Sequence, residues 1–101
     1  MNMMLKNLVN MLKNERADDY NEWINIGFAL HSIEPENEDL LAIWDDFSQR
    51  SSKYDPQSCD SFWYKMKFRD DGINLGSIHH WAKQDSPDMF FKFKAIYNKS
   101  Y

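Results

Sequence analysis

A segment rich in cationic and aromatic side chains lies in the second half of this sequence, and these residue types bind nucleic acids. Residues 50–69 contain five cations but only two carboxylates, Asp55 and Asp60. Lysine and arginine attract phosphates, and aromatic rings stack on unpaired bases. Tyr54 and Tyr64 lie among the cations. The candidate nucleic-acid-binding residues are Arg50, Lys53, Tyr54, Lys65, Lys67 and Arg69.

The helical spacing of this segment leaves two interpretations open. On a helix, Lys65 and Arg69 lie one turn apart on one side of an apolar stripe, and Lys67 lies on the other side. The helix is predicted to end at the turn formed by residues 70–72. The cations could contact a nucleic-acid strand, or they could be solvated side chains that border a buried stripe.

Catalytic and metal-binding patterns are weaker. Cys59 could pair with His79 or His80, but it falls on the apolar stripe of its predicted helix, which favours a buried, unreactive thiol. The adjacent acids Asp45–Asp46 and Asp70–Asp71 could hold Mg²⁺, but neighbouring helical residues point in different directions, which favours solvated carboxylates. Glycine-rich phosphate loops and complete zinc-ligand sets are also missing from the sequence. We expect no catalytic residue, metal or cofactor in the chain itself.

Length and composition indicate one small globular domain. The chain has 101 residues, 43% of them hydrophobic and 16% aromatic, and one cysteine, which argues against a two-domain enzyme, disorder and an internal disulfide. We expect a soluble, intracellular protein, because no apolar run approaches the roughly 18 residues of a membrane span. Residues 1–46 contain three Lys/Arg against ten Asp/Glu, whereas residues 47–101 contain nine against six. This uneven distribution permits a basic surface on one part of the protein, although the net charge is −4.

The elements that must position these residues are helices. Apolar residues recur at three- and four-residue spacing in six stretches, and none alternates as a half-buried strand does. We therefore predict an all-α fold, a compact bundle of five to six short helices with short connections. The stretches are Leu5–Leu12, Tyr20–Leu30, Leu40–Phe47, Cys59–Met66, Leu75–Ala82 and Met89–Tyr97.

Local signals predict where these helices begin. Asp19 and Asn37 are suited to cap helix N-termini, because their side chains can accept hydrogen bonds from free backbone amides. Asp55–Pro56 and Ser86–Pro87 each combine a capping residue with a proline suited to the first helical position. Gly27 lies inside a predicted helix, where glycine is unfavourable, so we expect another helix or a large ring to approach it closely.

Residues 16–83 resemble the primase C-terminal domain of the second type, a small helical module of replication proteins from viruses, plasmids and prophages. No single motif carries the resemblance, which lies in the order and spacing of short elements along about two thirds of the chain. These elements are Asp19–Tyr20, Trp23, Gly27–Leu30, Trp44–Ser48, Ser52–Asp55, Cys59, Trp63, Ile73–Ile78 and Ala82–Lys83.

The resemblance implies a non-catalytic accessory domain of a DNA primase-helicase. Such modules follow an archaeo-eukaryotic-type primase domain and precede a superfamily 3 helicase, so these domains are the implied partners. The implied role is to help primer synthesis begin by binding template single-stranded DNA, nucleotide or both, in the host cytoplasm or at a virus replication site. We expect residues 1–101 to form a single domain within a larger primase-helicase. Its family-like core would span residues 16–84, and residues 86–101 would form a helical extension.

Two other functions stay open at this point. A protein-docking module that orients primase against helicase, or recruits a replication partner, would use the acidic N-terminal half and the last aromatic stretch, which includes Phe90, Phe91 and Phe93. A stand-alone nucleotide-binding enzyme would require turnover by the chain alone. In the template-binding hypothesis, Lys53, Lys65, Lys67 and Arg69 contact the template backbone, and Tyr54 stacks on or orients the strand.

Overall fold

The computed structural model describes residues 2–67 and 72–98, and within these ranges the chain forms helices and no strand. The all-α prediction is confirmed. The described residues form seven helices, one more than the upper end of the predicted five to six, because a single helical turn, α2, forms in the polar stretch between the first two predicted helices. The helices are α1 (Asn2–Asn10), α2 (Glu15–Asp18), α3 (Tyr20–Ile33), α4 (Glu38–Ser48), α5 (Ser58–Lys65), α6 (Leu75–Asp85) and α7 (Pro87–Asn98).

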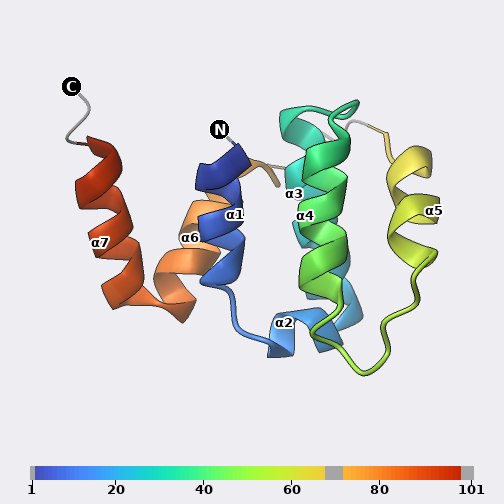
Figure 1. The fold of residues 1–101 in the computed structure, drawn as a ribbon, viewed down its shortest axis with the longest axis horizontal. Coiled ribbons are helices and arrows are strands. Elements are labelled where there is room, and N and C mark those ends of the chain that lie inside the picture. The colour runs from blue at the N-terminus through green and yellow to red at the C-terminus, as the bar shows by residue number, and fades with distance from the viewer. Residues whose placement is uncertain (1, 68–71, 99–101) are drawn as a thin grey trace.

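The helices pack around a central pair formed by α3 and α4 (Figure 1). Helix α5 packs mainly on α4, while α1 contacts α4 and α6. Helix α7 packs on α6 and lies at the opposite end of the molecule from α5 (Figure 1). The two ends of the bundle therefore expose different surfaces.

Most of the predicted helix starts are confirmed. The Asp19 side chain accepts from the Glu22 amide at 3.1 Å, and Asn37 accepts from the Asp39 amide at 2.9 Å. Asn74 and Ser77 form a reciprocal capping box at the start of α6. These short-range bonds satisfy amides that have no partner within the helix.

The predicted bounds of α5 are wrong at both ends. The helix begins at Ser58 rather than at Pro56, because Asp55 forms a turn in which its carboxylate accepts from the Gln57 amide at 3.0 Å. It ends at Lys65, since Met66 is extended with ψ of 142°. Arg69, together with residues 70 and 71 of the predicted turn, lies outside the described residues.

A tryptophan from α4 fills the space beside Gly27. A Cβ atom at Gly27 would lie 2.5 Å from two atoms of the Trp44 ring, so the expected close approach of a large ring is confirmed. Trp44 is fully buried, stacks on Trp23 at 4.8 Å between ring centroids, and donates its indole N–H to the Trp23 carbonyl at 3.1 Å. The glycine therefore fixes how close α3 and α4 come, and through Trp44 it supports Trp23.

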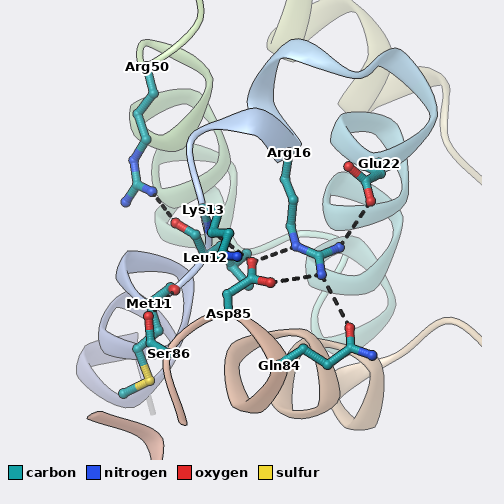
Figure 2. Close-up of polar contacts among 9 residues, drawn as sticks. All are labelled: Met11, Leu12, Lys13, Arg16, Glu22, Arg50, Gln84, Asp85 and Ser86. Carbon is teal, nitrogen blue, oxygen red and sulfur yellow. Dashed lines mark hydrogen bonds and ion pairs between the residues drawn. The ribbon is translucent and has the colours of Figure 1, made fainter. Parts of the chain in front are cut away.

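An ion pair between two segments far apart in the sequence holds α2 against the end of α6 (Figure 2). Arg16 donates from Nε to Asp85 at 2.6 Å and from Nη2 to the second carboxylate oxygen at 3.0 Å. The Lys13 backbone amide donates to the same carboxylate at 2.9 Å. Burial opposes ionisation of Asp85, but these hydrogen bonds lower its pKa overall, and the carboxylate raises the pKa of Arg16.

Two further side chains bind the backbone that links α1 to α2 (Figure 2). Ser86 donates to the Met11 carbonyl at 2.7 Å, and Arg50 donates to the Leu12 carbonyl at 2.7 Å. We call the side chains of Arg16, Arg50, Asp85 and Ser86, with the backbone of residues 11–13, the clasp. Its contacts satisfy polar groups of a connection that lies between helices.

Candidate nucleic-acid interface

A pocket of about 270 Å³ lies where α2, α3 and α5 meet the loop of residues 49–57. We call it the loop pocket. Its walls combine aromatic rings with a few charged groups, so it can hold a flat apolar ligand and contact the ligand's polar edge. The aromatic lining residues are Tyr20, Trp23, Tyr54 and Phe62, and the charged ones are Asp18, Lys53 and Asp55.

Trp23 is held in place within the loop pocket by hydrogen bonds from neighbouring helices. Its indole N–H donates to the Ser48 hydroxyl at 2.6 Å, and that hydroxyl donates to the Trp44 carbonyl at 2.7 Å. The Cys59 sulfur lies 3.1 Å from the same hydroxyl. Desolvation raises the pKa of the buried Cys59 thiol to about 11, so the thiolate needed for nucleophilic chemistry is disfavoured.

A second, more open hollow of about 430 Å³ adjoins the loop pocket, since Tyr20 and Phe62 line both. We call it the lysine hollow, because Lys65 and Lys67 lie on its rim. Both lysines are exposed, and neither forms an ion pair with another described residue. The expectation that they flank opposite sides of the stripe is wrong: α5 ends at Lys65, and both side chains reach the same hollow.

Tyr20 and Phe62, which line both hollows, belong to the apolar stretches Tyr20–Leu30 and Cys59–Met66 of the predicted helices, but they are exposed. Tyr20 is 58% exposed and Phe62 is 37% exposed. Their rings lie 6.3 Å apart between centroids, and each also contacts Trp23, at 5.8 and 5.5 Å respectively. The apolar periodicity could not separate them from their buried neighbours. The position of Tyr20 directly after the Asp19 cap is the one local sign that its ring lies at the helix end.

The remaining predicted site residues have different surroundings. Lys53 and Tyr54 line the loop pocket; the Lys53 ammonium donates to the Asp18 carbonyl at 3.4 Å, and the Tyr54 hydroxyl donates to Asp45 at 2.9 Å. The hydrogen bond to Asp45 is the main cause of the raised pKa of Tyr54. Arg50 belongs to the clasp instead. Its guanidinium lies 4.9 Å from the Phe47 ring centroid, and desolvation lowers its pKa.

The structure thus brings together four of the six predicted residues, Lys53, Tyr54, Lys65 and Lys67, around the adjoining hollows. Arg50 lines another hollow, which shares no lining residue with these two, and Arg69 lies outside the described residues. A surface with exposed rings beside cations can hold bases and phosphates of a single strand.

No three His, Cys, Asp or Glu side chains among residues 2–67 and 72–98 are grouped so as to hold a metal ion. None of the helices there combines the length and apolar character needed to cross a bilayer. The ring of His79 packs against Phe90 and Phe93.

Comparison with known proteins gives a consistent result. The pattern of the family described as "Primase C terminal 2 (PriCT-2)" matches residues 5–82. The chain is 38% identical over 85 residues to "Putative helicase 121R" of Invertebrate iridescent virus 3 and covers 9% of that protein, with 80% of the chain aligned. It is 37% identical over 95 residues to "Putative helicase 184R" of Invertebrate iridescent virus 6, with 88% of the chain and 10% of the relative aligned.

A helicase-named protein of Acanthamoeba polyphaga mimivirus is 32% identical over 92 residues, with 90% of the chain and 9% of the relative aligned. The chain therefore spans about a tenth of the length of these curated relatives. No solved structure matches significantly.

Proposed function

The chain belongs to the Primase C terminal 2 family, and from this premise we propose that it is an accessory domain of a viral replication protein that binds template single-stranded DNA. In this proposal the domain is not itself catalytic and lies in one polypeptide with primase and helicase domains. The helicase names of its relatives, which are about ten times longer, support this context.

The observation that carries the proposal is the juxtaposition of exposed rings with lysines in the lysine hollow. Tyr20 and Phe62 offer faces and edges on which bases can stack, and Lys65 and Lys67 lie on the rim of the same hollow. Neither lysine pairs with a carboxylate of the described residues, so both can neutralise phosphates. We propose Lys53 and Arg69 as further phosphate contacts, while Arg50 already holds the α1–α2 connection.

The need for such a domain follows from how a primer starts. The first bond requires a template and two free nucleotides to meet without a duplex that holds them together. A domain that binds the template strand lowers the entropic cost of this encounter for the catalytic domain. Binding of nucleotide at the same surface would serve the same purpose.

A salt titration with labelled single-stranded DNA tests the proposal. Four phosphate contacts predict a slope of about −3 in the plot of log affinity against log salt concentration. Lys65→Gln with Lys67→Gln should reduce the slope to about −1.4 and weaken binding about tenfold at low salt. A flat salt response of the wild-type chain would contradict template binding through these cations.

The matched control is Lys92→Gln with Lys94→Gln. These two exposed lysines of α7 carry the same charge but line neither hollow. The control variant should keep the wild-type slope. An equal loss in both variants would mean that net charge, rather than the lysine hollow, governs binding.

The second candidate, a protein-docking module, is favoured by the apolar surface of α7. Met89 and Phe91 are more than half exposed there, as is Ile96, whereas Phe90 and Phe93 are buried against the bundle. Charge reversal at Lys65 and Arg69 should abolish DNA binding with unchanged folding if the domain contacts the template. Phe91→Asp should abolish only a partner complex if the domain docks through α7.

A further inference from the structure

We propose that the loop pocket takes up one unstacked base of the bound strand and favours a base that carries an exocyclic amino group. This inference deepens the proposed function and rests on it, because the strand must first bind along the lysine hollow. It assigns to the loop pocket a role separate from that of the lysines, namely to distinguish one base from another.

The size and walls of the loop pocket suit a single ring system. Its volume of about 270 Å³ lies just below the range of about 300–1,000 Å³ that is typical of drug-sized ligands. Trp23 is fixed by its bond to Ser48 and by the stack on Trp44, so it offers a rigid surface. Tyr20 and Phe62 contact the Trp23 ring directly, at 5.8 and 5.5 Å between centroids, so the three rings form one aromatic wall against which a flat ligand can pack.

The charged groups of the loop pocket are two carboxylates, which only accept hydrogen bonds, and the Lys53 ammonium, which donates to the Asp18 carbonyl. Asp18 and Asp55 both line it, and the Asp18 carboxylate has no hydrogen bond to any described residue. Asp55 uses one carboxylate oxygen for the Gln57 amide, which leaves the other oxygen available. Other polar groups of the pocket already serve the fold: the Ser58 hydroxyl donates to the Asp55 carbonyl, and the Tyr54 hydroxyl donates to Asp45.

Acceptors select a donor on the ligand. Carboxylates pair with the amino group of cytosine, and uracil presents a carbonyl oxygen at the same position, which a carboxylate repels. A base with an amino group therefore gains a hydrogen bond in this pocket, whereas uracil or thymine leaves a carboxylate facing a carbonyl oxygen.

The charges in and near the loop pocket argue against two other ligands, a phosphate and a cationic side chain. A phosphate inside the pocket would meet the carboxylates of Asp18 and Asp55, so the exposed Lys53 can contact a phosphate only outside the pocket. A cationic side chain of a partner protein would approach past Lys65 and Lys67, which repel it. A polyanionic strand is attracted by these lysines, and because Tyr20 and Phe62 line both hollows, a base of that strand can reach the pocket.

A single base substitution isolates the expected contact. The 101-residue chain is titrated with a labelled ten-nucleotide deoxyuridine strand and with the same strand carrying one central deoxycytidine. The two strands have equal charge. At the substituted position cytosine has an amino group at C4 and an acceptor at N3, where uracil has a carbonyl oxygen and an N–H group. We expect the strand with deoxycytidine to bind about tenfold more tightly.

The variant that tests the assignment is Asp18→Ala with Asp55→Asn, in which asparagine keeps the acceptor for the Gln57 amide. It should bind both strands with affinities within about twofold of each other. Glu36→Ala with Asp88→Asn removes the same charge from exposed residues outside the pocket and should keep the tenfold preference. Asp18→Ala alone repeats the test if the double variant does not fold, which circular dichroism reports.

Each outcome has one meaning. Equal binding of both strands by the wild-type chain overturns the preference for an amino group but leaves strand binding intact. A preference that survives in the Asp18 variants overturns the assignment to the loop pocket. Failure of every strand to bind overturns the proposed function itself.

Discussion

The clasp and the lysine hollow both contain cationic side chains near aromatic rings, but those cations have different partners. In the clasp, Arg16 makes two hydrogen bonds to Asp85, and the side chains are only 13% and 6% exposed. In the lysine hollow, Lys65 and Lys67 are exposed and have no ion pair among the described residues. One region uses its charge to hold the fold together, and the other presents it to solvent.

This difference shows that sequence proximity does not predict the role of a cation. Arg50 and Lys53 are three residues apart, yet Arg50 binds the Leu12 carbonyl in the clasp, whereas Lys53 lines the loop pocket. A paired, buried cation costs much to disturb, because its partner is left without compensation. An exposed lysine contributes little to stability and stays available for a ligand.

The largest effect is expected from breaking the clasp. Asp85→Ala leaves the Lys13 amide without its acceptor and the Arg16 guanidinium with only Glu22 and Gln84, so we expect the free energy of unfolding to fall by about 2–4 kcal/mol. Urea denaturation measures this loss. A decrease below about 1 kcal/mol would show that the ion pair behaves as an exposed one and that the contrast with the lysine hollow is unfounded.

The next effect concerns the tryptophan that supports the aromatic wall. Gly27→Ala would place a methyl group against the Trp44 ring, and we expect a loss of about 1–3 kcal/mol despite alanine's better helix propensity. Thermal unfolding measures the loss. Trp44→Phe in the same chain should recover part of it, since the smaller ring makes room; strictly additive losses would contradict a direct clash.

The pH dependence of stability should distinguish the contribution of the clasp from that of His31 and His79. Desolvation lowers the pKa of His31 and also of His79, so the unfolded state takes up protons first and stability falls as the pH decreases below about 6.5. The lowered pKa of Asp85 means that its contribution is present above about pH 4 and is lost in more acidic solution.

Urea midpoints measured between pH 8 and pH 3 record both steps. Asp85→Asn should remove the acidic step and leave the histidine step unchanged. A single transition that is identical in the two proteins would contradict the assignment of the acidic step to the clasp.

The smallest effect on stability is expected in the lysine hollow. Lys65→Gln with Lys67→Gln should change the free energy of unfolding by less than about 0.5 kcal/mol, because neither side chain is buried. Urea denaturation checks this beside the DNA titration described above. A loss as large as that of Asp85→Ala would mean that these lysines also hold the fold.

Much of the fold was predictable because its signals are local. The Asp19 and Asn37 caps join residues two or three positions apart, so the pattern of residue types alone locates these helix starts. The start of α5 was mispredicted at Pro56, because the Asp55 side chain can cap a turn as well as a helix, and the sequence signal is the same for both.

The candidate site was predictable only in part. The composition of residues 50–69 indicated cations that could contact a nucleic-acid strand. It could not show that Arg50 binds the Leu12 carbonyl of the α1–α2 connection, 38 residues away. The exposure of Tyr20 and Phe62 also depends on packing. Trp23, Trp44 and Trp63 fill the space between α3, α4 and α5, so no room is left there for these two rings.

By itself, the sequence determined that the chain is helical, where most of its helices begin, and that a helix or a large ring approaches Gly27, because these properties follow from neighbouring residues and apolar spacing. Only the tertiary structure decided which cations are paired and which rings stay exposed. Those outcomes depend on the limited space between helices and on hydrogen bonds between segments far apart in the chain, as between Arg16 and Asp85.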